Sequence, residues 1–236
     1  MVSTVRHIDH TKMGRGKHGW LDSHFHFSFA EYHNLDNINF GVLRVLNDDM
    51  VQPGEGFDTH PHKDMEIISY VVEGELTHAD SMKNNRTLTR GQVQYMSAGT
   101  GVLHSEYNLS DDRILRFLQI WIFPDKEGYA PNYGDAPFAW EDRVNRWMPI
   151  ASGGRNPDAP ITIHADANLY AAEITNNNSL EFKIESGRQA YLVLIEGAAR
   201  VNGQDMTARD AMEIVEQDVD IRTESKAHVL IIEMSV

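Results

Sequence analysis

The sequence predicts an all-β protein with a β-sandwich or barrel in each half. Short runs rich in β-branched and aromatic residues recur along the 236 residues, separated by corners that contain Gly, Asn or Asp. Almost no stretch has the 3.6-residue apolar period of a long amphipathic helix, so helix is expected to be a minor component. With 41% hydrophobic residues, the chain can bury a sizeable core, and disorder is not expected.

The predicted strands fall into an N-terminal and a C-terminal group. They lie within residues 41–49, 66–78, 86–99, 113–123, 180–185, 190–203, 206–216 and 228–236. The clearest turns are at residues 73–75, 83–85 and 201–205, where Gly and Asn tolerate a positive φ angle.

A change of composition separates the two groups. Six prolines lie between residues 124 and 160, and because proline limits both helix and central-strand pairing, we expect a surface linker there. We therefore expect an N-terminal domain in residues 1–130, followed by the linker and a C-terminal domain in residues 131–236. IEGAARVNGQD near residue 200 is weakly similar to VEGELTHAD near residue 77, which suggests an internal duplication.

Charge and composition exclude several classes of function. The net charge is −14, with 35 acidic and 21 basic residues, so direct binding to nucleic acid or to an anionic membrane is not expected. The chain has no cysteine, which excludes disulfides, thiolate metal sites and thiol catalysis. The N-terminal residues lack the apolar stretch of a signal peptide, and no run approaches the length of a membrane span, so we expect a cytoplasmic protein.

Two short segments each offer metal-binding side chains at alternate positions. These are His60 with His62, and His104 with Glu106. Side chains two residues apart in a strand point to the same face, so each pair can aim at one point. Some of the twelve histidines will pair by chance, but two such pairs beside strand-like sequence predict one site made of nitrogen and oxygen ligands. In the C-terminal half, only His164 and His228 remain, so no metal site is expected there.

The sequence around these pairs resembles a known family. GEGFDTHPHKDMEIISYVVEG and GQVQYMSAGTGVLHSEYN are similar to the two motifs of the cupin superfamily, and the closer resemblance is to the bicupin family pirin. GWLDS and FSFAEY near the N-terminus add to this resemblance, which is strong over residues 14–123. The resemblance implies a bicupin, with two β-barrel or jelly-roll domains and few short helices.

The resemblance also implies a ligand set. In the general cupin pattern the glutamate of the first motif is a ligand, but Glu66 is followed by seven residues before Gly74, where that pattern has six. Resemblance to pirin instead implies His60, His62, His104 and Glu106 as ligands. Glu66 is then either a hydrogen-bond partner of a ligand imidazole or a charge at a strand edge.

The activity that the resemblance implies is that of a quercetin 2,3-dioxygenase, which cleaves a flavonol with O₂ and releases CO. One divalent transition metal is expected, with iron favoured by the resemblance and copper, nickel, cobalt, manganese or zinc left open. Glu106 would be both ligand and catalytic base, and the partners would be a small aromatic substrate and O₂. The alternative is a metal-loaded pirin-type regulator that acts through a protein partner. A hydrolase or isomerase is less well supported, because no acid–base pair can be named.

Other polar and aromatic side chains have two interpretations each. His78 and Asp80 have the alternate spacing, but they lie near a turn and are expected at a hairpin end. His24 and His26 could line the mouth of the site. Phe25 and Phe27, which have the opposite strand parity, could equally well be the residues that pack into it. Candidates for either pocket wall or core are Phe25, Phe27, Met96 and Tyr107.

Overall fold

The computed structural model describes residues 4–236, which divide into two compact β units. The N-terminal unit contains residues 14–138 and 163–165. The C-terminal unit contains residues 139–162 and 166–236 together with the described residues up to Met13. The first described residues belong to the C-terminal unit because β1 (Thr4–Ile8) pairs antiparallel with β19 (Ala211–Val215). Pairing between strands about two hundred residues apart leaves no local signal in the sequence.

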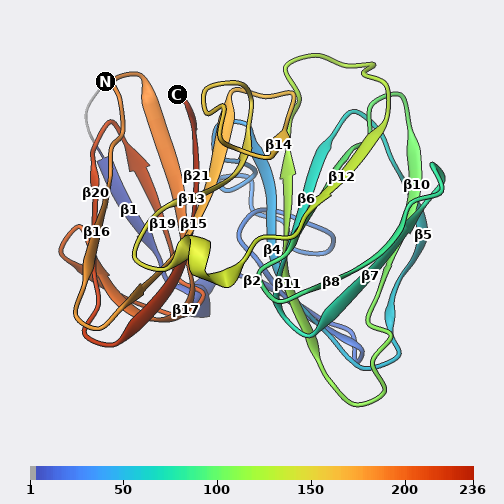
Figure 1. Cartoon of the computed structure of the whole chain (residues 1–236), viewed down its shortest axis with the longest axis horizontal. Helices are drawn as coiled ribbons and strands as arrows, with labels where there is room; N and C mark the ends of the chain where they lie inside the picture. Colours follow the sequence, from blue (N-terminus) through green and yellow to red (C-terminus); the bar gives the residue numbers. More distant parts are fainter. Residues whose placement is uncertain (1–3) are drawn as a thin grey trace. The chain divides into compact units, whose positions relative to one another are not determined.

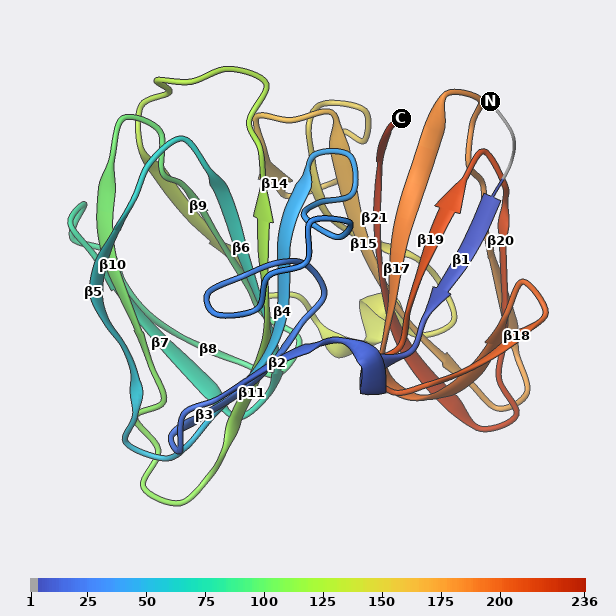
Figure 2. The same cartoon turned by 180° about the vertical axis from the view of Figure 1, so that it is seen from behind.

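The N-terminal unit is built from two antiparallel sheets (Figures 1 and 2). The larger has the strand order β12-β9-β6-β11-β4-β3-β2, and the smaller has the order β5-β10-β7-β8. The strands are β2 (Gly14–Lys17), β3 (Leu21–Phe25), β4 (Leu43–Val51), β5 (Gly56–His62), β6 (Glu66–Glu73), β7 (Glu75–Asp80), β8 (Asn85–Thr89), β9 (Val93–Ser97), β10 (Val102–Tyr107), β11 (Leu115–Ile122) and β12 (Asn132–Ala136).

The two sheets of this unit pack through a shared apolar cluster. Val71 and Phe117 of the larger sheet meet Leu76 and Leu88 of the smaller one, and all four are at most 3% exposed. Along β6 the inward positions alternate, so Ser69 shares the inner face with Val71. The inner face is therefore apolar at one end, and it carries polar groups at the level where the site lies.

The C-terminal unit is a second set of strands around an apolar interior, antiparallel except for the parallel pair of β13 and β14. Its main path is β1-β19-β17-β21-β15-β13-β14, with β16, β18 and β20 attached. The remaining strands are β13 (Met148–Ser152), β14 (Ile161–Thr162), β15 (Ala167–Thr175), β16 (Ser179–Phe182), β17 (Arg188–Val201), β18 (Gln204–Thr207), β20 (Val219–Arg222) and β21 (Lys226–Ser235). Sixteen buried apolar residues, among them Leu192, Leu194, Val229 and Ile231, form its core cluster.

The weak sequence repeat has a structural counterpart in the two units. Gly74 and Gly197 have φ angles of +78° and +85°, and a Cβ at either one would lie within 2.5 Å of a backbone oxygen. Both positions therefore require glycine for the same two reasons, a left-handed conformation and a close approach of neighbouring backbone. Each glycine follows the end of a central run of buried residues in its unit.

The proline-rich segment is more regular than the expected linker. β12 pairs with β9 at the edge of the larger sheet, between Pro131 and Pro137. β13 pairs with β15, and Pro149 lies at an irregularity in that register. Edge strands and bulges are among the places where a sheet accepts proline, which explains how these strands form.

Helix is minor, as expected. Over residues 4–236 it is limited to the short 3₁₀ segments η1 (His10–Lys12) and η2 (Trp140–Arg143). None of the helices in this range is long and apolar enough to span a membrane.

Candidate metal centre

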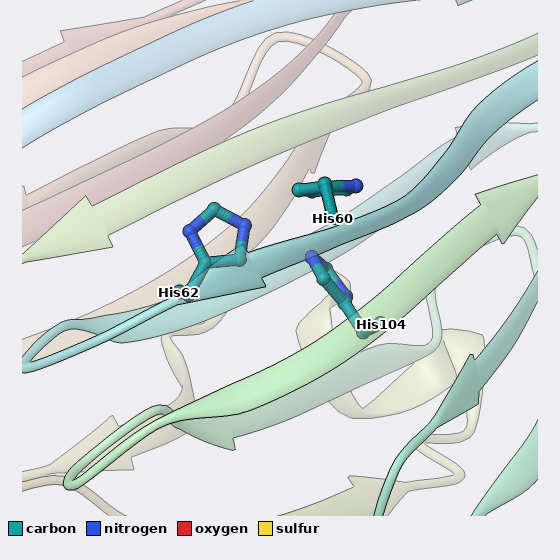
Figure 3. Close-up of side chains that lie close together, drawn as sticks. All are labelled: His60, His62 and His104. Atoms are coloured by element: carbon teal, nitrogen blue, oxygen red, sulfur yellow. The ribbon is translucent and has the colours of Figure 1, made fainter.

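Three histidines converge inside the N-terminal unit (Figure 3). His60 and His62 lie on β5, two residues apart, and His104 lies on the neighbouring strand β10, directly opposite His60 in the register. The ring centroids are 4.5 to 4.8 Å apart in all three pairs. One ligand nitrogen from each ring lies within 4.8 Å of the others, which is close enough for the three to share an ion.

The local environment leaves these rings with free lone pairs. His60 Nδ1 donates to the carbonyl oxygen of Asp58 at 2.7 Å, which leaves Nε2 as the acceptor nitrogen. Neither nitrogen of His104 has a hydrogen-bond partner among the described residues, although the side chain is only 2% exposed. A buried polar group without a partner costs about 1–3 kcal/mol, and a metal ligand bond would remove that cost.

The electrostatics also favour neutral imidazoles. Burial, followed by the neighbouring histidines, lowers the pKa of His104 to about 3 and that of His62 to about 4. Both rings are therefore deprotonated at neutral pH, as metal coordination requires. The residues present fit a transition-metal ion.

Glu106 lies in the same region but in a second group. Its carboxylate accepts from Ser69 Oγ at 2.8 Å, from Gln94 Nε2 at 2.7 Å and from Gln119 Nε2 at 2.6 Å. Its ligand oxygen forms a compact trio with His78 and His104, all of them buried. The structure thus gathers the three histidines in one trio and Glu106 in another, with His104 common to both. The described donors to this 2% exposed carboxylate are all neutral, so its charge is not paired by them.

Glu66 contacts a different histidine. Its carboxylate accepts from Tyr95 Oη at 2.5 Å, Ser97 Oγ at 2.6 Å and the backbone N–H of His164 at 2.9 Å. Glu66 has the opposite strand parity from Ser69, so it lies on the other face of β6 from Glu106. Its described imidazole contact is with His164 and not with the converging histidines, which departs from the role expected for it beside the ligands.

His78 and Asp80 do more than end a hairpin. Asp80 accepts from the backbone N–H groups of Met82 and Asn84, which is the expected turn role. The His78 ring is fully buried, lies 4.8 Å from the ring of Tyr133 in a stacked arrangement, and approaches Asp80 Oδ2 at 3.2 Å. His78 is thus a buried neighbour of Glu106, its partner in the β10–β7 register.

A cavity of about 290 Å³ opens beside the histidines. His60, His62 and Glu106 line it together with an aromatic wall. The remaining lining residues are His18, Leu21, Ser23, Phe25, Phe29, Ala30, Asn47, Asp49, Phe57, Gln119 and Trp121. The volume and the apolar walls suit a small aromatic molecule.

Among the four candidates for the pocket wall, the structure places Phe25 in this lining. Phe27 and Met96 are core residues, and Tyr107 donates to Asp58. His24 and His26 are 7% and 1% exposed and are not part of the lining.

Sequence reasoning missed the polar lining residue Asp49. Its carboxyl accepts from Ser23 Oγ at 2.5 Å, and burial raises its pKa to about 7. The only signal in the sequence was three consecutive polar residues, NDD at 47–49, within a strand-like run. Without the register, nothing indicates that Asn47 and Asp49 face the cavity and Asp48 does not.

In the C-terminal unit, Asp9, His10 and Asp210 also lie close enough to share an ion. The two oxygens of Asp210 already accept from His10 Nδ1 at 2.8 Å and from the backbone N–H of Thr207 at 2.9 Å, and His7 Nε2 lies 3.2 Å away. These contacts explain the cluster as an attachment of the segment around β1 to the rest of its unit.

Two cupin-type β units, one carrying converging histidines beside a cavity, define a bicupin protein. Residues 7–122 match the family model described as Pirin, and residues 150–234 match the one described as Quercetinase C-terminal cupin domain. The chain belongs to the pirin family, which confirms the resemblance and the predicted fold class.

Relatives match over nearly the full length. A Pseudomonas aeruginosa protein provisionally named a quercetin 2,3-dioxygenase is 42% identical over 225 residues, covering 95% of this chain and 97% of that protein. The quercetin 2,3-dioxygenase of Escherichia coli K12 is 38% identical over 222 residues, or 94% of each chain. The crystal structure of the bacterial pirin YhhW from Escherichia coli in complex with nickel(II) has a TM-score of 0.92 and 35% identity, covering 98% of this chain and 99% of that one.

Proposed function

We propose that the protein is a metal-dependent dioxygenase that cleaves a flavonol such as quercetin with O₂, by 2,3-dioxygenation with release of CO. The observation that carries this proposal is the convergence of three lone-pair-bearing imidazoles beside a cavity with aromatic walls. Relatives named as quercetin 2,3-dioxygenases support the choice of substrate.

In this proposal His60, His62 and His104 hold the metal through ring nitrogens, and Glu106 supplies the fourth, anionic ligand. Nitrogen and oxygen donors of this kind suit iron, copper, nickel, cobalt, manganese or zinc. Iron was expected from the resemblance, and the nickel(II) complex of YhhW makes nickel an equal candidate. A bound metal would supply the Lewis-acidic position at which a flavonol and O₂ are activated.

Glu106 is also the proposed base. Its Oε1 accepts two hydrogen bonds, from Ser69 and Gln94, whereas Oε2 accepts one, from Gln119. Oε2 therefore has the free lone pair, which would either bind the metal or take the proton from the 3-hydroxyl of the flavonol. The aromatic wall would hold the flat rings and exclude water from the reacting carbon atoms.

The test combines metal analysis with turnover. Metal content of the purified protein is measured, and loss of flavonol absorbance is followed together with O₂ uptake for the wild type and for His104→Ala. His33→Ala, at an exposed loop histidine, is the matched control. Turnover that depends on the metal, persists in His33→Ala and is lost in His104→Ala supports the proposal.

Two other outcomes contradict it. Tight metal binding without oxidation of any flavonol would favour the metal-loaded regulator that acts through a protein partner. A protein that binds no transition metal under any loading condition would refute both functions.

A further inference from the structure

One level of the larger sheet is polar on its inner face across four neighbouring strands. The register aligns Gln94 of β9 with Ser69 of β6, Ser69 with Gln119 of β11, and Gln119 with Asn47 of β4. The first three side chains hold Glu106 through hydrogen bonds. Asn47, at the end of this row, has no such role.

Asn47 is a buried amide whose hydrogen bonding is incomplete. Its side chain is 3% exposed and lines the cavity, and its Oδ1 has no hydrogen-bond partner among the described residues. Buried polar atoms are nearly always hydrogen-bonded in folded proteins, so an orphaned amide oxygen at a cavity wall points to a partner that is supplied by a ligand.

Asp49 lies next to this amide on the same face of β4, two residues further along the strand. It is 3% exposed, lines the same cavity and accepts a hydrogen bond from Ser23 of β3. Asn47 and Asp49 thus give the cavity a second polar region in addition to the histidines and Glu106.

The two polar regions arise from different sheets. His60 and His62 belong to the four-stranded sheet, whereas Asn47 and Asp49 belong to the seven-stranded sheet. All four line one cavity, with Phe25, Phe29, Phe57 and Trp121 as its aromatic walls. An aromatic molecule in this cavity can therefore meet the histidines and still have polar partners on the other sheet.

We propose that the Asn47 amide and the Asp49 carboxyl form a subsite that hydrogen-bonds a ring hydroxyl of the aromatic ligand. This inference rests on the proposed function, and it adds a preference for flavonols that carry hydroxyl groups beyond the one at position 3. A ring hydroxyl can donate its one proton to the orphaned amide oxygen, while its own oxygen accepts from the protonated form of the Asp49 carboxyl. A ring without such a hydroxyl leaves the buried Asn47 oxygen unpaired, which weakens the binding of that ligand.

The experiment compares two probes on nickel(II)-loaded protein without O₂, by quenching of tryptophan fluorescence. Quercetin carries hydroxyls on each ring system, and 3-hydroxyflavone carries only the one at position 3. Asn47→Leu and Asp49→Leu should each weaken quercetin binding about 3- to 10-fold, the value of one net hydrogen bond, and leave 3-hydroxyflavone binding within about twofold. Asp49→Asn, which keeps hydrogen-bonding capacity, should retain the preference for quercetin.

Phe29→Leu is the control, because it trims the aromatic wall and should weaken the binding of both probes to the same extent. Equal losses for both probes in Asn47→Leu and Asp49→Leu, or no loss in either variant, would overturn the subsite while leaving the proposed function intact. A nickel-loaded wild type that binds neither probe would refute the proposed function, and the subsite with it.

Discussion

Replacing His104 with asparagine should make the free energy of unfolding of the metal-free protein less dependent on pH between 7 and 5. Burial holds the pKa of His104 at about 3 in the folded state, against 6.5 for the free side chain. Because the folded pKa is lowered, the unfolded chain takes up the proton first as the pH falls below 6.5. The stability associated with neutral His104 is therefore complete above that pH and is lost progressively between about 6.5 and 3.

The magnitude follows from the width of this window. A pH of 5 lies about 1.5 units below the histidine pKa of the unfolded chain, and each unit corresponds to about 1.4 kcal/mol. Protonation of His104 in the unfolded chain therefore lowers the free energy of unfolding by about 2 kcal/mol at pH 5 relative to pH 7. The side chain is only 2% exposed, so solvent screening reduces this value little.

The assay is urea unfolding of chelator-treated protein at pH 7 and pH 5. The change in free energy of unfolding between the two pH values should be about 2 kcal/mol smaller in His104→Asn than in the wild type. His33→Asn, at an exposed histidine, should behave as the wild type does. If His104→Asn loses as much stability between pH 7 and pH 5 as the wild type, the lowered pKa and the argument built on it are wrong.

Contacts within each of the two units lead to three further predictions. Nickel(II) at about 100 times its dissociation constant should stabilise the wild type by about 2.7 kcal/mol in thermal unfolding, and His60→Ala should lose most of that gain; equal stabilisation of both would place the ion elsewhere. Gln119→Leu removes the described donor to Glu106 Oε2 and should cost about 1.5–3 kcal/mol in urea unfolding, and a cost below about 0.5 kcal/mol would show that this bond contributes little. Arg188→Leu leaves the buried Glu233 without its bidentate partner and should destabilise the C-terminal unit by about 3–5 kcal/mol, whereas an unchanged melting temperature would contradict the pairing.

Much of the fold could be predicted because its signals are local. The two-residue period, the glycine corners and the shortage of helical periodicity are all visible within ten or so residues, and they predicted a β protein with two units. The pairing of β1 with β19 could not be predicted this way, because it depends on hydrogen bonds between distant parts of the chain. The strands β12 and β13 were hidden by their prolines, which an edge position and a bulge accommodate.

Part of the candidate site could likewise be predicted from local sequence, and part depends on contacts between distant strands. The alternate spacing of His60 and His62 placed both on one face of a strand, and it predicted their convergence without any tertiary information. Glu66 and Ser69 lie on opposite faces of β6, and the contact of Ser69 with Glu106, which depends on the tertiary structure, shows which of these faces carries the site. Asn47 had no signal of its own, since a buried amide is defined by what surrounds it.

By itself, the sequence indicated an all-β protein with two units and the shared face of His60 and His62, because side-chain period and residue chemistry are properties of short segments. The tertiary structure decided how those segments meet. The register of β5 and β10 sets His104 opposite His60, and the larger sheet supplies the polar row that holds Glu106 and ends at Asn47. Such contacts between strands are fixed by the packing of the whole unit, and no single segment of the chain contains them.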